Sequence, residues 1–258
     1  MASDQAFQDW SWDNPERCTT LLDGIRADGA RCKKLEALTM RPPFSRQQLR
    51  GVGITGIEFA AFRTRHPAGI AADYVPVRSD DAETEPERVF LLDGESYFIT
   101  LDITRKLPFE TGSVDWVYAE HLIEHVPLDV GIGWLAELHR IMAPGALLRL
   151  TTPDLRRYAR NYLADSGFLV EHRERMRDVL APSPPMPARP AFMMNQMFYF
   201  YGHRWIYDVD ELRYALSRAG FEHAGVRERS FRRGAQPDIA ALDTEVRSDE
   251  TVYVEVSR

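Results

Sequence analysis

Hydrophobic runs that predict strands alternate along the chain with amphipathic stretches that predict helices. We predict strands at residues 56–62, 70–75, 114–119, 146–151, 224–229 and 251–257, and helices at residues 130–142, 153–163 and 209–219. Asp93-Gly94 lies between two apolar runs, which predicts a β-hairpin over residues 88–100. Strands that alternate with helices usually pair in parallel. We therefore expect an α/β fold whose mostly parallel sheet is flanked by helices.

Two segments lie outside this alternating pattern. Asn14 can cap a helix and Pro15 suits its first turn, so we expect a helix over residues 14–39 within an N-terminal helical lead-in, residues 1–50. Residues 51–258 form the main domain in this interpretation, with a cap inserted at about residues 165–205. The proline-rich residues 181–190 of the cap cannot form regular structure.

A stretch dense in Met, Phe and Tyr, residues 192–201, follows the proline-rich segment. Two interpretations are open for it. The side chains can belong to the hydrophobic core, or they can line a binding site, because Met and aromatic groups make adaptable apolar walls. We favour the second interpretation, in which this stretch is a lid over the binding site of a substrate.

Composition and charge exclude several classes of function. The chain has 258 residues, enough for one large α/β domain, and its net charge of −7 argues against nucleic-acid binding. No apolar run reaches the roughly 18 residues of a membrane span, and residues 1–12 are too polar for a signal peptide. The two cysteines form no metal-binding pair. We expect a cytoplasmic protein that acts on a small molecule, as a monomer or a homodimer.

Acidic residues recur at the predicted ends of successive strands. Glu58, Asp73, Asp102 and Glu120 lie at four such ends, and His121 follows the last of them. In open parallel sheets, ligands bind outside the carboxyl ends of the strands. Ionised carboxylates only accept hydrogen bonds, so they suit the hydroxyl and amino groups of a nucleoside. This arrangement predicts a nucleoside-containing ligand at that edge of the sheet.

Blocks of sequence in the same region resemble a known enzyme family. Leu101–Phe109, Gly112–His125, Glu137–Gly145 and Leu148–Asp154 follow one another as in the class I S-adenosylmethionine (SAM)-dependent methyltransferases, type 11 branch, and Gly202–Asp208 resembles a later block. The resemblance spans roughly residues 56–221. It implies a Rossmann-like fold with a seven-stranded sheet, SAM as the cofactor and S-adenosylhomocysteine as its product.

The resemblance also implies which residues contact the cofactor. The methionine part of SAM would contact Glu58, Ala60, Ala61 and Phe62, and its ribose hydroxyls would contact Asp73. The adenine would contact Asp102 and Ile103, and the sulfonium centre would lie beside Glu120 and His121.

The family's glycine-rich turn, which follows the first strand, has two candidates in this chain. Gly51-Val-Gly-Ile-Thr-Gly56 matches GxGxxG but precedes the first predicted strand, and the residues before it are too polar for a buried parallel strand. Glu58–Phe62 follows the start of that strand, and Asp73 comes 15 residues after Glu58. We favour this second turn, with alanine where glycine is usual. Alanine is disfavoured at positive φ, so we expect a weakened or reshaped cofactor site.

A metal-binding motif is also present. His121-Leu-Ile-Glu-His125 matches HxxEH, a zinc signature of one class of peptidases. That function needs a long helix that carries the motif and a third ligand further along the chain. Here the motif ends an apolar strand just before Pro127. We therefore predict no metal site and keep a zinc hydrolase only as a remote alternative.

The function that we expect is in-line transfer of a methyl group from SAM to an O, N or C atom of a small, partly apolar metabolite. His121 and His203 are the candidates for removing a proton from the acceptor. The candidates for binding the acceptor are Tyr158, Met197, Tyr201, Arg204 and Tyr207. The alternative from another class is a SAM-fold protein with a degenerate glycine turn that does not methylate and serves another reaction or a partner.

Overall fold

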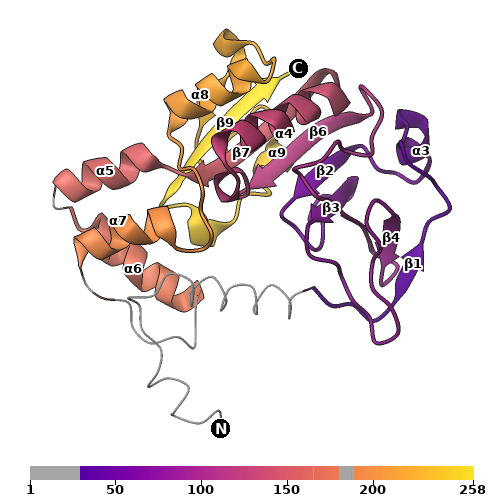
Figure 1. Cartoon of the computed structure of the whole chain (residues 1–258), viewed down its shortest axis with the longest axis horizontal. Helices are drawn as coiled ribbons and strands as arrows, with labels where there is room; N and C mark the ends of the chain where they lie inside the picture. The colour runs from indigo at the N-terminus through magenta and orange to yellow at the C-terminus, as the bar shows by residue number, and fades with distance from the viewer. Residues whose placement is uncertain (1–29, 165, 180–186, 188) are drawn as a thin grey trace, which may run out of the picture.

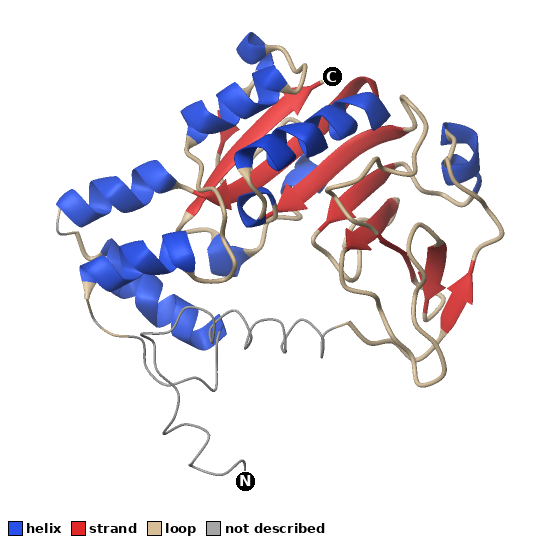
Figure 2. Cartoon of the chain, in the orientation of Figure 1, coloured by secondary structure: helices blue, strands red, loops and turns tan. Residues whose placement is uncertain are grey.

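A mixed sheet of nine strands forms the centre of the part of the chain that the structure describes (Figures 1 and 2). The computed structural model describes residues 30–164, 166–179, 187 and 189–258. The strands are β1 (Leu35–Ala37), β2 (Gly56–Phe59), β3 (Gly69–Asp73), β4 (Val89–Leu92), β5 (Ser96–Thr100), β6 (Val114–Glu120), β7 (Met142–Pro153), β8 (Arg227–Arg229) and β9 (Thr251–Ser257). Their order across the sheet is β1-β4-β5-β3-β2-β6-β7-β9-β8. The central strands β5, β3, β2, β6 and β7 pair in parallel.

The α/β class and the parallel centre of the sheet confirm the prediction, but the described sheet has nine strands where seven were expected. The additional strands are β1 and β4, which pair in antiparallel fashion at one edge. β4 is the first arm of the predicted hairpin. β1 occupies part of the segment predicted as a helix, because Leu35 and Ala37 both pack against the cluster that contains Phe90. Residues 14–29 of that predicted helix lie outside the described residues.

Helices and short turns cover the two faces of the sheet. On one face α4 (Leu128–Ile141) packs against α8 (Val209–Arg218), and α4 buries the predicted face of Trp134, Leu135, Leu138 and Ile141 in the main core. The other face packs against Ile239 of α9 (Pro237–Ala240) through a separate cluster. The remaining short helices outside the cap are α3 (Arg46–Gly51), η1 (Ile123–His125), η2 (His223–Gly225) and η3 (Glu245–Arg247).

Three helices form a separate layer that follows the carboxyl end of β7 (Figure 1). They are α5 (Leu155–Leu163), α6 (Phe168–Val179) and α7 (Pro190–Tyr199), and all three pack against one another. Their shared hydrophobic cluster, which includes Tyr158, Leu169 and Met197, is distinct from the core of the sheet. The Met- and aromatic-rich stretch is therefore a helix with its own small core. From here on the cap means α5, α6 and α7, so it includes α5 in addition to helices of the segment predicted at about residues 165–205. None of the helices in the described segments is both long and apolar enough to span a membrane.

Candidate active site

A cavity of about 640 Å³, which we call the strand-end cavity, lies at the carboxyl ends of the central strands. β3 and β5 lie on one side of β2, and β6 and β7 lie on the other, so the strand order reverses between β2 and β6. Ligands of open α/β sheets bind at such a reversal. Seven of the nine residues predicted to contact the cofactor line this cavity: Ala60, Phe62, Asp73, Asp102, Ile103, Glu120 and His121.

Two carboxylates from neighbouring strands line the strand-end cavity. Asp73 ends β3, and it pairs in register with Thr100 of β5, two residues before Asp102. Each carboxylate also stabilises its own turn through one oxygen. Asp73 Oδ1 accepts a hydrogen bond from the backbone N–H of Val75 at 3.0 Å, and Asp102 Oδ1 accepts one from that of Thr104 at 2.9 Å. These bonds fix the orientation of both side chains beside the cavity.

Of the two glycine-turn candidates, the turn after β2 is the one that lies at the strand-end cavity. β2 ends at Phe59, and Ala60 lines the cavity with a φ of 56°. The GxGxxG segment lies at the other end of β2, because Gly51 ends α3 and Gly56 begins the strand. A Cβ on Gly56 would collide with the Trp116 ring, so this glycine serves close packing. Ala60 therefore occupies the turn at the cavity, in a conformation that favours glycine.

Replacement of Ala60 by glycine is expected to raise the free energy of unfolding by up to about 1 kcal/mol, because glycine adopts positive φ without a Cβ clash. Ala61 is the matched control, since its φ is not positive. Ala61→Gly is expected to lower the same free energy by about 0.4–1 kcal/mol through the added entropy of the unfolded chain. Denaturant titration measures both variants, and a loss of stability in Ala60→Gly would contradict strain at this turn.

Glu58 and Ala61 are the two predicted cofactor residues that do not line the cavity. Glu58 is buried within β2, and its carboxylate accepts hydrogen bonds from the backbone N–H and Nε of Arg65 at 2.9 and 3.0 Å. It also accepts one from Thr64 Oγ1 at 3.1 Å. Glu58 thus orders the loop that follows the turn. Ala61 packs against the cluster around Phe90.

His121 lies directly after β6 in an unusual backbone conformation, with a φ of 50°. Its backbone N–H donates to the carbonyl of Thr151 at 3.0 Å, and its ring is buried. Burial, together with the nearby charge of Arg247, lowers the pKa of His121 well below its usual range, so the ring is neutral. The preceding residue, Glu120, accepts hydrogen bonds from the backbone N–H and hydroxyl of Thr244, both at 2.9 Å.

The hydrogen bonds of Thr251 assign the tautomer of the neutral His121 ring. Thr251 Oγ1 lies 2.6 Å from the carbonyl oxygen of Arg247, which can only accept, so the single hydroxyl proton is donated there. His121 Nε2 lies 2.7 Å from the same Oγ1 and must then be the donor. The lone pair of the ring is consequently on Nδ1. That nitrogen is the atom of His121 able to take up a proton.

A second, smaller cavity of about 200 Å³ lies between this strand end and the cap. Four of the chain's seven histidines line it, namely His121, His125, His172 and His203, and we call it the histidine cavity. Met176 of α6 and Met197 of α7 contribute apolar surface. His121, His125 and Arg247 line both cavities. The two cavities are therefore neighbours that share one wall.

A chain of buried hydrogen bonds supports the outer wall of the histidine cavity. Tyr158 Oη donates to Glu250 Oε2 at 2.6 Å and lies 2.7 Å from His172 Nε2, while His172 Nδ1 lies 3.2 Å from Asp249 Oδ2. Burial lowers the pKa of His172, but the hydrogen bond to Asp249 and the charges of Glu250 and Asp249 outweigh it, so the pKa is raised. His172 can then donate from both nitrogens, which ties α5 and α6 of the cap to the segment before β9.

The structure brings together most of the residues predicted to bind the acceptor. Tyr158, Met197 and Tyr201 line the histidine cavity, and so does His203, one of the two predicted proton acceptors. Arg204 and Tyr207 do not. The side chain of Arg204 is exposed, and its backbone N–H donates to the carbonyl of Glu124 at 2.6 Å. Tyr207 is buried in the main core beneath α4, where a Cβ on Gly131 would lie 3.0 Å from its Oη, so it has a packing role.

The sequence analysis missed four ionisable residues of the histidine cavity. His125, His172, Arg247 and Glu250 line the histidine cavity, and none of them was assigned to a site. His125 belongs to the HxxEH motif, which was the one available signal. His172 lies in α6, a helix that was not predicted, and Arg247 and Glu250 lie in the connection to β9. Only the fold places these distant segments next to Glu120 and His121.

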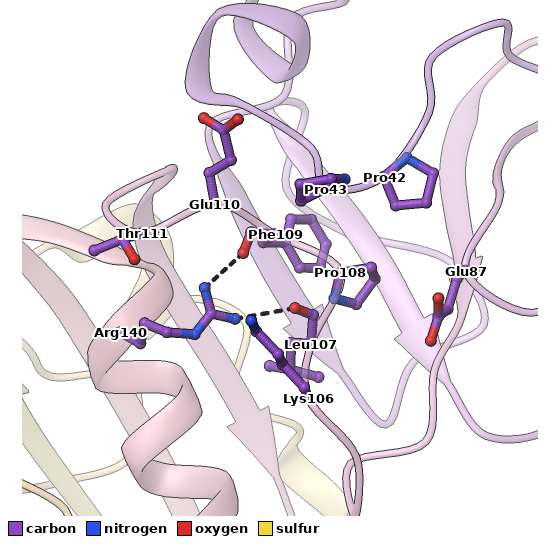
Figure 3. A pocket seen from close by; sticks show the side chains of 10 residues that line it. All are labelled: Pro42, Pro43, Glu87, Lys106, Leu107, Pro108, Phe109, Glu110, Thr111 and Arg140. Atoms are coloured by element: carbon purple, nitrogen blue, oxygen red, sulfur yellow. Dashed lines mark hydrogen bonds between the residues drawn. The ribbon is translucent and has the colours of Figure 1, made fainter.

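A larger surface groove of about 710 Å³ lies at the amino end of β6, away from both cavities (Figure 3). Arg140 crosses it and donates to the carbonyls of Phe109 and Leu107 at 2.7 and 3.0 Å. The same guanidinium binds Glu137 of α4 at 2.7 Å. These bonds hold the loop before β6 against α4. We assign this groove to structure, because ligands of this fold class bind at the opposite, carboxyl ends of the strands.

Comparison with known proteins gives one family match. The methyltransferase-domain family matches residues 51–224. No curated protein sequence gives a significant match. Solved structures that resemble the chain include a SAM-dependent methyltransferase from Archaeoglobus fulgidus (10% identity, TM-score 0.43, covering 83% of this chain and 92% of that one). Another is a possible histamine N-methyltransferase from Thermotoga maritima (15% identity, TM-score 0.40, covering 84% of this chain and 89% of that one). At these values the structural similarity assigns no substrate.

Proposed function

The chain belongs to the methyltransferase-domain family and is a SAM-dependent methyltransferase, and from that premise we propose that it methylates a small, partly apolar metabolite held in the histidine cavity. The family match confirms the predicted enzyme class and cofactor, and it does not single out the type 11 branch. The proposal concerns the acceptor and the residues that serve it. The observation that carries it is the wall of His121, His125 and Arg247 that the two cavities share.

The strand-end cavity fits the cofactor in size and chemistry. Its volume of about 640 Å³ lies within the roughly 300–1,000 Å³ of small-molecule sites. Asp73 and Asp102 offer carboxylate oxygens from adjacent strands, which suits them to ribose hydroxyls and to the adenine amino group. When bound, SAM supplies a methyl group already activated by the sulfonium. The protein's contribution is then chiefly alignment of the acceptor.

The histidine cavity supplies what the acceptor needs. Met176 and Met197 give an apolar surface that adapts to a ligand, and the cap shields it from water. His121 lies where the two cavities meet, and its Nδ1 carries the ring's lone pair. We assign to His121 the uptake of a proton from a hydroxyl or amino acceptor, with its Nδ1 held 3.4 Å from Glu124 Oε1. Tyr158 and Tyr201 offer hydroxyl groups that can orient a polar substituent.

A variant that fills the histidine cavity separates acceptor binding from cofactor binding. Met176 is half-buried and lines only this cavity. Met176→Trp is expected to abolish transfer of a labelled methyl group from SAM to small phenols and amines, because the indole would occupy the acceptor's space. Affinity for S-adenosylhomocysteine should stay within about threefold of wild type, because Met176 does not line the strand-end cavity. Retained transfer to these acceptors in the variant would place the acceptor elsewhere.

A further inference from the structure

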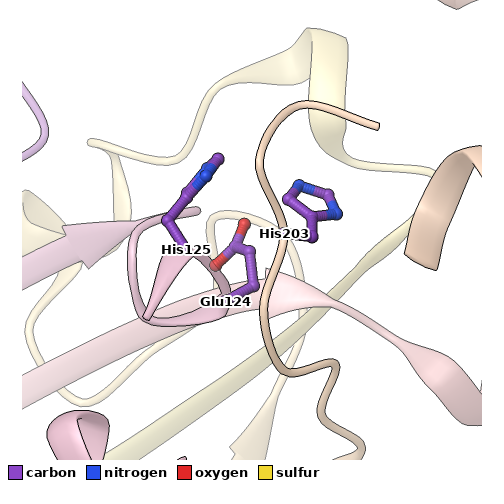
Figure 4. A group of neighbouring side chains, drawn as sticks. All are labelled: Glu124, His125 and His203. Carbon is purple, nitrogen blue, oxygen red and sulfur yellow. The ribbon is translucent and has the colours of Figure 1, made fainter. Parts of the chain in front are cut away.

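Three potential metal ligands meet at the wall between the two cavities (Figure 4). Glu124, His125 and His203 each present a donor atom, and these atoms all lie within 4.8 Å of one another. Glu124 and His125 come from the turn η1 after β6, and His203 comes from the loop between α7 and α8. Tetrahedral bonds of about 2.0–2.1 Å to an ion require separations of roughly 3.4 Å, so a modest rotation of these side chains would close the site.

The carboxylate of Glu124 is unusual because it is completely buried and only half satisfied. Its residue has 0% exposure. Oε2 accepts a hydrogen bond from Thr152 Oγ1 at 3.0 Å, whereas Oε1 has no hydrogen-bond partner among the described residues. A buried carboxylate oxygen without a partner is costly, and buried charges are normally paired or coordinate a metal.

The ring beside that oxygen uses its other nitrogen elsewhere. His121 Nδ1 lies 3.4 Å from Glu124 Oε1, and His121 Nε2 lies 2.7 Å from Thr251 Oγ1. A positive charge at this point would stabilise the buried carboxylate oxygen, and a metal ion held by Glu124 would provide it.

His203 is oriented as a metal ligand would be. Its Nδ1 lies 2.6 Å from the carbonyl of Met197 and must donate to it, so in the neutral ring Nε2 carries the lone pair. Ligating histidines usually donate their other N–H to a carbonyl or carboxylate in this way. The loop is also fixed to the turn that carries Glu124, because the backbone N–H groups of Arg204 and Trp205 both donate to the carbonyl of Glu124. The separation between the two ligand-bearing segments is thus set by the backbone.

From this geometry we propose that Glu124, His125 and His203 bind one divalent transition-metal ion, Zn²⁺ or an ion of similar preference. Two imidazoles and a carboxylate are a ligand set that such ions favour, and three protein ligands leave a coordination position for a water or an acceptor oxygen. His125 and His203 line the histidine cavity, so that position faces the acceptor proposed above. The metal site itself does not depend on the proposed acceptor.

Metal titration of the full-length protein tests this proposal. After treatment with a chelator and its removal, the protein is titrated with Co²⁺ without SAM or acceptor, and the visible d–d absorption is recorded. We expect about one Co²⁺ per chain, displaced by Zn²⁺, with the intense bands of a site of low coordination number. Glu124→Gln keeps the size of the side chain, and His203→Gln changes a partly exposed residue, so neither depends on a large repacking. The affinity of both variants for Co²⁺ is expected to fall at least about 100-fold. This loss is larger than substitutions of residues outside the ligand set usually cause.

Two further variants separate this site from other binding. Thr152→Val removes the hydrogen bond to Glu124 Oε2 without changing the ligands, and it is expected to weaken Co²⁺ binding about 10- to 100-fold. His223→Gln replaces an exposed histidine away from the site and should bind as wild type. No uptake of Co²⁺ by the wild type, or equal uptake by Glu124→Gln and wild type, would overturn the proposal. Neither result bears on methyl transfer, which Met176→Trp tests separately.

Discussion

Replacement of Arg149 by methionine is expected to lower the free energy of unfolding by about 3–5 kcal/mol, the largest stability effect that we predict. Arg149 lies in β7 with its side chain fully buried, and it binds Asp243 at 2.5 Å and Glu255 at 2.8 Å. Methionine would leave two buried carboxylates without their main counter-charge. Arg229 and the backbone N–H of Arg232 retain bonds to them, which keeps the loss within this range.

The Arg149 substitution also bears on the site. Asp243 immediately precedes Thr244, which binds Glu120, and Arg247 lines both cavities. Denaturant titration measures the stability, with Arg227→Met as the matched control on an exposed side chain of the edge strand β8. The control is expected to change stability by less than about 0.5 kcal/mol. A loss of similar size in both variants would show that the buried ion pairs are not the cause.

Replacement of His121 by asparagine is expected to lower kcat for a hydroxyl or amine acceptor by about 10²–10⁴-fold, the range of general-base catalysis. Asparagine tolerates the positive φ at this position and is smaller than histidine, so it fits the buried site. It lacks a nitrogen that takes up a proton. Affinity for S-adenosylhomocysteine should change much less than kcat, since Asp73 and Asp102 are unaltered.

The measurement for His121→Asn is steady-state methyl transfer with an acceptor that wild type accepts, together with calorimetry of S-adenosylhomocysteine binding. His139→Asn is the control, because His139 packs against Phe221 away from both cavities. An unchanged kcat in His121→Asn would remove the proton-transfer role from His121. A loss of cofactor affinity as large as the loss of kcat would instead make its role structural.

Much of the fold could be predicted because local patterns determine it. The apolar face of α4 and the Asp93-Gly94 hairpin were read from spacing alone, and both are present. β1 could not be predicted, because its three residues form a strand only through pairing with β4. α6 was also missed, since its sequence is largely polar and Phe168, Leu169 and Met176 find their apolar surroundings only in the cluster shared with the other cap helices. These elements depend on partners that a local pattern does not reveal.

In the candidate site, too, some residues could be predicted from the sequence and others only from the structure. Asp73 and Asp102 were predicted because a parallel sheet brings its strand ends to one edge, whatever the side chains around them. Glu58 occupies an equivalent position in sequence, yet Arg65 binds its carboxylate, and only the loop geometry reveals this. The HxxEH motif gave no metal site on a helix, but the turn η1 presents Glu124 and His125 to His203, a residue from a distant loop.

The central claim is that the cofactor in the strand-end cavity faces an acceptor in the histidine cavity across His121. A crystal structure of the complex with S-adenosylhomocysteine tests it most directly. The account predicts the ribose at Asp73, the adenine beside Asp102 and Ile103, and the sulfur atom next to His121 with its open side toward the histidine cavity. A sulfur atom turned away from His121, or the product bound in the groove at Arg140, would contradict it.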